Sequence, residues 1–107
     1  MDKLALIKLL LNEEVKASVN KVESFLELGK PYSFRTVTMI YTGKLIGINE
    51  QELLVDEAAW IPETERWADF VATGAHKECE PYVKPIVINR GSLLDVTEIP
   101  ATLRKQK

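Results

Sequence analysis

Four side chains between residues 76 and 80 have the types that bind metal ions or carry out nucleophilic catalysis: His76, Glu78, Cys79 and Glu80. A His and a Cys three positions apart can supply two zinc ligands, but no second pair exists to complete a four-coordinate site. Cys79 would act as a nucleophile only with a base and an orienting partner, and His76 is the only histidine. A solvated loop is the favoured interpretation, and we expect no enzymatic activity, no metal and no cofactor.

Three aromatic residues in the middle of the chain form a second candidate site. Trp60, Trp67 and Phe70 carry flat side chains of the kind that stack on nucleic-acid bases. Aromatic residues in apolar surroundings more often pack into a core or a subunit interface. The sequence therefore favours packing over base stacking for these three residues.

The first element that could position such side chains is a helix predicted over residues 2–28. The segment contains no Gly or Pro, and its apolar residues recur at spacings of three and four, as in an amphipathic helix. These residues are Leu4, Ile7, Leu11, Val15, Val19, Val22 and Phe25 or Leu26. Asp2 can cap its start, Gly29 can follow its end, and Pro31 prevents its continuation. Its charges are mixed, so we expect it to cover a sheet or neighbouring helices rather than a membrane.

After Pro31 the pattern becomes that of strands, and residues 34–99 are predicted to form one strongly bent antiparallel sheet. Gly43 and Gly47 lie inside strand-like sequence, which indicates bulges or bends. The expected elements are strand-like residues 34–41 and 44–48, a turn at 49–51, a strand at 52–61 closed by Pro62, a strand at 83–88, a turn at 89–91 and a strand at 93–99. The predicted fold class is mainly β with an N-terminal α-helix, in a strongly bent antiparallel sheet or small open barrel.

A variable insert at about residues 62–81 interrupts this pattern. Residues 64–73 are predicted either as a short helix, which Thr64 would cap and Gly74 would end, or as a strand over 67–71. Residues 75–81 are predicted to be an exposed loop, and residues 100–107 a frayed basic tail.

Length and charge limit the classes of function. The chain has 107 residues, enough for one domain over 1–107. Its formal net charge is −2, whereas proteins that depend on phosphate contacts are usually basic. The apolar run Leu9–Leu11 is too short for a membrane span or signal peptide, which predicts a cytoplasmic protein. A single cysteine excludes an intrachain disulfide.

An open sheet of this size leaves strand edges uncovered. Uncovered edges offer unpaired N–H and C=O groups to another chain. The strands on either side of Gly91 are the best placed for such pairing. If a head-to-tail contact closes by rotation, the product is a ring, so the sequence predicts self-association.

Two separated segments resemble motifs of the Sm-like family, which includes the Sm, LSm and Hfq proteins. Residues 43–49 (GKLIGIN), followed by 53–58 (LLVDEA), are similar to the family's first motif. Residues 87–94 (VINRGSLL) resemble its second motif, in which a basic-glycine turn joins two apolar strands. The order of the motifs, the insert between them and the preceding helix also fit, and the general character is similar to that of small bacteriophage proteins.

The resemblance implies a bent sheet, a ring of about five to seven subunits and a nucleic-acid site at Asn49, Arg90 and Gly91. RNA-binding members usually have Asp at the position of Asn49, and an amide where this chain has Glu52. A carboxylate there repels phosphate. Arg90 is equally well interpreted as a residue that lines a ring pore or as a salt-bridge partner in a turn.

Two functional hypotheses therefore remain. In the first, the ring binds single-stranded RNA weakly. In the second, it is a structural or assembly protein, for example of a phage, and binds another protein. The negative net charge and Glu52 are obstacles only to the first hypothesis.

Overall fold

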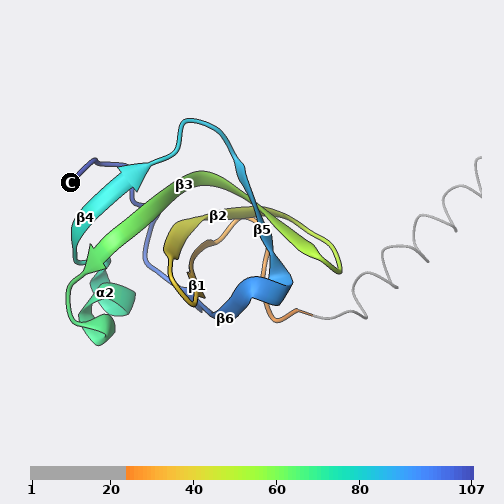
Figure 1. Cartoon of the computed structure of the whole chain (residues 1–107), viewed down its shortest axis with the longest axis horizontal. Helices are drawn as coiled ribbons and strands as arrows, with labels where there is room; N and C mark the ends of the chain where they lie inside the picture. The colour runs from red at the N-terminus through yellow and green to blue at the C-terminus, as the bar shows by residue number, and fades with distance from the viewer. Residues whose placement is uncertain (1–23) are drawn as a thin grey trace, which may run out of the picture.

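The computed structural model describes residues 24–107, which form an antiparallel six-stranded sheet with one short α-helix (Figure 1). The elements are β1 (Pro31–Thr36), β2 (Ile40–Ile48), β3 (Glu52–Thr64), α2 (Trp67–Thr73), β4 (His76–Pro81), β5 (Ile86–Asn89), the 3-10 turn η1 (Arg90–Ser92) and β6 (Leu93–Glu98). The strand order is β4-β3-β2-β1-β6, and β5 also pairs with β3. A mainly β fold with an antiparallel sheet is confirmed.

The predicted helix over 2–28 lies largely outside the described residues. Residues 24–28 are described and contain a bend and a turn instead of helix, so the predicted end of the helix is wrong. The sheet also starts earlier than expected, at Pro31. Its start is extended by the N–H of Gly29, which donates to the carbonyl of Leu45. Among the described residues, no helix is long and apolar enough to cross a membrane.

The first hairpin contains a turn that the sequence did not reveal. Residues 34–41 were expected to be continuous strand, but β1 ends at Thr36 and β2 begins at Ile40. The Thr36 hydroxyl accepts the N–H of Met39 at 3.0 Å, and the N–H of Thr36 donates to the Met39 carbonyl at 2.8 Å. A β-branched residue supplies the turn's hydrogen bonds, so neither Gly nor Pro marks it.

Strand β3 is the central element of the sheet. Along one edge it pairs with β2, and along the other it pairs first with β5 and then with β4. It continues through Pro62 to Thr64, beyond the predicted end at residue 61. A bulge opposite Gly43 places Glu57 at a φ of 48°, and the pairing with β2 shifts there. Such bulges bend and twist a strand.

Within the insert, the helical alternative is the correct one. Helix α2 covers Trp67–Thr73 and ends at Gly74, whose φ of 80° lies in the left-handed region. Its N-cap is Arg66, not Thr64, and no side chain caps it.

The loop predicted over 75–81 is wrong, because residues 76–81 form β4. The charged side chains suggested a loop, but Lys77, Glu78 and Glu80 are exposed to solvent while Cys79 between them is buried. The following strand is shorter than predicted. Strand β5 begins at Ile86, immediately after Pro85, which cannot donate to a ladder.

Two apolar clusters cover opposite faces of the sheet. The first contains Phe34, Leu45, Leu53 and other buried residues of β1, β2, β3 and β5. The second contains Ile61, Phe70, Cys79 and Ile99, and Leu103 packs against it. Residues 100–107 are therefore not a frayed tail, although they contain no helix or strand.

Candidate functional site: the Asn49–Arg90 junction

The three predicted site residues lie in two turns that are distant in sequence. Asn49 stands in the turn between β2 and β3, where its side-chain oxygen accepts the N–H groups of Gln51 at 2.8 Å and Glu52 at 2.7 Å. The N–H of Asn49 donates to the Glu52 carbonyl at 3.0 Å. An Asn side chain that accepts from the residues following it stabilises a tight turn. The Asn49 oxygen is thereby occupied, and its amide nitrogen has no hydrogen bond among the described residues.

Arg90 and Gly91 stand in η1, between β5 and β6. The side-chain oxygen of Asn89 accepts the N–H of Gly91 at 2.8 Å, and the Ser92 hydroxyl donates to the Asn89 carbonyl at 2.7 Å. This local capping fixes the direction in which the chain leaves β5.

Arg90 connects the two turns across 41 positions of sequence, where its guanidinium donates to the Asn49 carbonyl at 2.6 Å. Its backbone N–H donates to the carbonyl of Gln51 at 2.8 Å. The structure thus brings Asn49 and Arg90 into contact, and Gly91 lies beside them. We call these two turns, residues 49–52 and 89–92, the Asn49–Arg90 junction.

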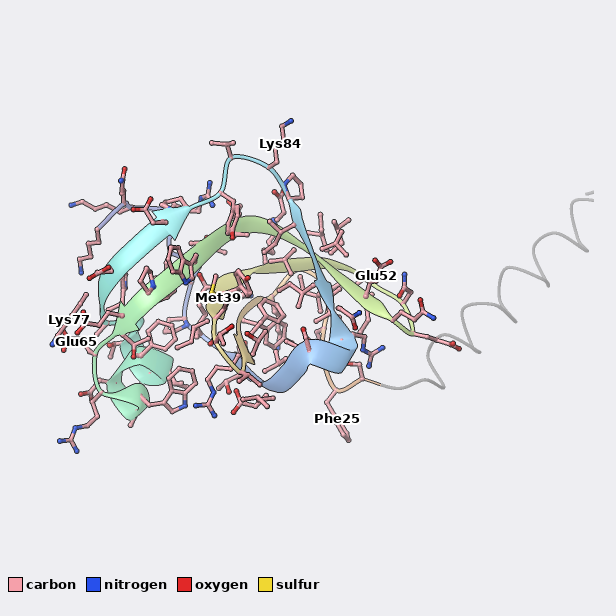
Figure 2. The ribbon with its side chains drawn as sticks, viewed as in Figure 1. Phe25, Met39, Glu52, Glu65, Lys77 and Lys84 are labelled. Carbon is pink, nitrogen blue, oxygen red and sulfur yellow. The ribbon has the colours of Figure 1, made fainter. Side chains whose placement is uncertain are left out.

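The charge of Arg90 is not neutralised by an ion pair within the part of the chain that the structure describes. Its partner is a carbonyl oxygen, which carries no formal charge, and the guanidinium has further N–H groups that could donate to a ligand. Glu50 and Glu52 are exposed in the adjoining turn. Figure 2 shows Glu52 near that turn, at the opposite end of the molecule from Glu65 and Lys77. The junction therefore combines one cation with two nearby carboxylates.

A groove adjoins the junction on one side. Its volume is about 580 Å³, and it lies between the β1–β2 turn and β5. Its lining includes Val37, Tyr41, Tyr82, Val87 and Asn89. Val37 is 81% exposed and Val87 is 58% exposed, so apolar side chains stand open to solvent at this place. Burial, and to a smaller extent the neighbouring Tyr41, raises the pKa of the Tyr82 phenol, which therefore stays neutral near pH 7.

A smaller hollow of about 290 Å³ adjoins the other side of the junction. Gly47, Asn49, Glu52, Leu54 and Val87 contribute to its wall. Leu54 and Val87 face each other across β3 and β5. Val87 lines both hollows, so a polar junction lies between two partly apolar surfaces.

The residues around Cys79 do not form a comparable site. Cys79 is fully buried, and desolvation raises the pKa of its thiol. His76 is hydrogen-bonded through Nδ1 to the carbonyl of Gly74 at 2.6 Å. Within residues 24–107, no three His, Cys, Asp or Glu side chains are grouped as metal ligands.

The three aromatic residues do not form a common platform. Phe70 is fully buried, and Trp67 packs on it with 5.3 Å between ring centroids. Trp60 stands on β3 between Tyr41 of β2 and Glu80 of β4. Packing, the favoured interpretation, is confirmed for Trp67 and Phe70, which belong to the second apolar cluster.

One charged contact was not predicted. Arg35 on β1 makes a forked hydrogen bond to Asp95 on β6, with its Nε 3.0 Å from one carboxylate oxygen. The same guanidinium lies 4.5 Å from the ring centre of Trp67. The hydrogen bond from Arg35 holds the pKa of Asp95 below its usual value. No local motif signals this contact, because its members lie on three separate elements.

Comparison with known proteins gives no relative. No family model, curated protein or solved structure matches this chain. The function must therefore be inferred from the geometry of the Asn49–Arg90 junction, its two hollows and the edges of the sheet.

Proposed function

We propose that this chain is a non-enzymatic, Sm-like protein that assembles into a homo-oligomeric ring and binds single-stranded RNA weakly at the Asn49–Arg90 junction. The contact between Arg90 and Asn49 is the observation that carries the proposal. Two motifs that were singled out separately in the sequence meet there in space. The expected setting is the cytoplasm, of the host cell if the chain is encoded by a phage.

The strand order supports the Sm-like part of the proposal. Strands β4 and β5 lie one after the other along the same edge of β3, so they act as one interrupted strand. After β5, η1 turns the chain so that β6 pairs with β1. A bent antiparallel sheet whose last two strands are joined by a basic-glycine turn is what the sequence resemblance implies.

The strand edges support self-association. Strand β5 pairs on one edge with β3, and β6 pairs on one edge with β1. For their second edges, no backbone partner is found among the described residues. Val87 on β5 and Leu94 on β6 are 58% and 63% exposed. Pairing β5 of one copy with β6 of the next would cover both open strand edges. Closure of this head-to-tail contact gives a ring of about five to seven subunits.

Ring formation would also strengthen the RNA site. Each copy contributes one Arg90 whose charge has no ion-pair partner among the described residues, and several copies gathered around an axis create a local positive field. Glu50 and Glu52 oppose this field, which is why the proposed binding is weak.

The ring is tested by native mass spectrometry and light scattering of the full chain. We expect one discrete oligomer at micromolar concentrations. A clean monomer over that range would refute the ring.

The RNA site is tested by fluorescence anisotropy with a short single-stranded RNA at several salt concentrations. Arg90→Ala should weaken binding and lower the salt slope by about one unit for each phosphate that is no longer neutralised. Arg90→Lys keeps the charge and should retain most of the binding. Arg66→Ala is the matched control, because Arg66 stands beside α2, away from the junction. If Arg90→Ala and Arg66→Ala bind the RNA equally well, Arg90 does not contact RNA and serves only to connect the two turns.

A second candidate function is assembly with another protein, and the groove beside the junction favours it. Its lining is partly apolar, with Val37 and Val87 exposed, and apolar surfaces of this kind mark protein contacts. Under this hypothesis a pull-down recovers a protein and no RNA, and Val37→Asp abolishes the capture while Arg90→Ala does not.

A further inference from the structure

Residues 103–107 lie along the outer edge of β4, the edge that faces away from β3 (Figure 1). The N–H of Cys79 donates to the Lys107 carbonyl at 3.0 Å, and the N–H of Lys107 donates to the Cys79 carbonyl at 2.9 Å. This reciprocal exchange is the hydrogen-bond pattern of an antiparallel strand pair. The segment thus occupies backbone groups that an edge strand otherwise offers to another chain.

Side chains hold the segment at both ends of β4. The Arg104 guanidinium donates to the carbonyl of Ala58 at 2.5 Å and to that of Tyr82 at 2.8 Å. Lys107 donates through Nζ to the carbonyl of His76 at 2.9 Å. Near the middle of β4, the carbonyl of Leu103 accepts a hydrogen bond from the Cys79 thiol, and the Leu103 side chain packs against the second apolar cluster.

Charge also favours this arrangement. The two residues whose side chains hold the segment, Arg104 and Lys107, are basic, and the exposed side chains of β4 include Glu78 and Glu80. Opposite charges on adjacent strands attract each other, and the attraction weakens as salt rises.

We propose that residues 103–107 act as a strap that closes the β4 edge against a second copy of this chain. The proposal rests on the proposed self-association, because it adds which edges take part. The outer edge of β4 is occupied at Cys79, whereas β5 and β6 have no backbone partner on their second edges within the described residues. The strap therefore confines pairing between copies to β5 and β6. When it is released, β4 accepts a free strand edge of a second copy, and the subunits no longer close into one ring.

The test compares the full chain with two strap variants. Leu103→Asp combined with Arg104→Ala removes the apolar anchor and the double hydrogen bond, and Arg104→Ala alone removes only the second. Lys105→Ala is the matched control, because Lys105 is exposed and its side chain makes no hydrogen bond or ion pair among the described residues.

Two readouts are measured on each protein at the same concentration. The first is the rate at which iodoacetamide alkylates Cys79, which is fully buried and is the chain's only cysteine. We expect the double variant to react about tenfold faster or more, Arg104→Ala to lie between, and Lys105→Ala to match the parent chain. The second is the size distribution by light scattering, in which the double variant should form larger, polydisperse species.

The outcomes separate the strap from the ring. If Cys79 becomes reactive while the size distribution is unchanged, the strap does not guard against a second copy. Unchanged reactivity in both variants would mean that residues 103–107 do not cover β4 at all. A parent chain that is monomeric, with variants that associate, would refute the ring and support the strap. If circular dichroism shows that the double variant is unfolded, the single variant Arg104→Ala tests the strap with the same two readouts.

Discussion

Replacing Gly43 by Ala tests whether the bend of the sheet depends on close approach between β2 and β3. Thr42 pairs with Ala59 and Lys44 with Asp56, so Gly43 alone faces two residues of β3. A Cβ built on Gly43 would lie 2.9 Å from the Asp56 carbonyl oxygen and 3.1 Å from the Ala58 Cα, and closer still to a Val55 methyl group. Two of these three atoms belong to the backbone, so no side-chain rotation can relieve the clash.

The size of the effect follows from this geometry. Overpacking in a filled core costs about 1–3 kcal/mol, and Gly43 falls at the upper end because Val55 and Ala58 are fully buried. We expect Gly43→Ala to lower the free energy of unfolding by about 3 kcal/mol, a large share of the 5–15 kcal/mol typical of domains. For a domain of this size the loss corresponds to a fall of roughly 12–24 °C in Tm.

The assay is urea unfolding followed by tryptophan fluorescence, with Tm from circular dichroism, at one fixed protein concentration. Gly47→Ala is the matched control on the same strand. There a Cβ would meet only atoms of the Leu54 side chain, the nearest being its Cβ at 3.1 Å, so the two strands need to separate by only a few tenths of an ångström, and Leu54 is 38% exposed. The control should lose about 1 kcal/mol or less. If Gly43→Ala is no less stable than Gly47→Ala, close approach at Gly43 is not what the bend requires.

Two further predictions concern buried or paired polar groups, and both are read from urea midpoints. Asp95→Asn removes the carboxylate whose pKa is held low by Arg35. The parent chain should therefore be more stable than this variant by a constant amount above the ordinary Asp pKa of about 4, and the difference in stability should disappear as pH falls through the lower pKa of the folded state. A stability difference that is constant from pH 7 to pH 2.5 would contradict this. Thr42 is fully buried, and its hydroxyl has no hydrogen-bond partner in the described part of the chain, so Thr42→Val should stabilise by about 1 kcal/mol; a loss of stability would show that the hydroxyl is satisfied.

Much of the strand pattern was predictable because it depends on local chemistry. The apolar and β-branched runs predicted β3, β6 and the second half of β2 nearly where they lie, and Gly74 was correctly predicted as the end of the short helix. The turn between β1 and β2 was missed because its hydrogen bonds come from Thr36 instead of Gly or Pro. Strand β4 was missed because its exposed charges outnumber its buried residues, and only the partner strand β3 makes it a strand.

The candidate site shows the same division. Asn49, Arg90 and Gly91 were singled out from the sequence, but nothing local indicates that the Arg90 guanidinium reaches the Asn49 carbonyl 41 positions away. The groove beside them is likewise formed only when β5 comes near the β1–β2 turn.

A mainly β chain, with glycines at a bend and a basic-glycine turn before the last strand, can be predicted from the amino-acid sequence, because these features follow from backbone preferences of neighbouring residues. The meeting of two turns at Arg90, and the position of residues 103–107 beside β4 instead of in solvent, are seen only in the folded chain. Both arrangements depend on hydrogen bonds to backbone carbonyls. Every residue carries such a carbonyl, so its availability is set by the fold and not by the side chain.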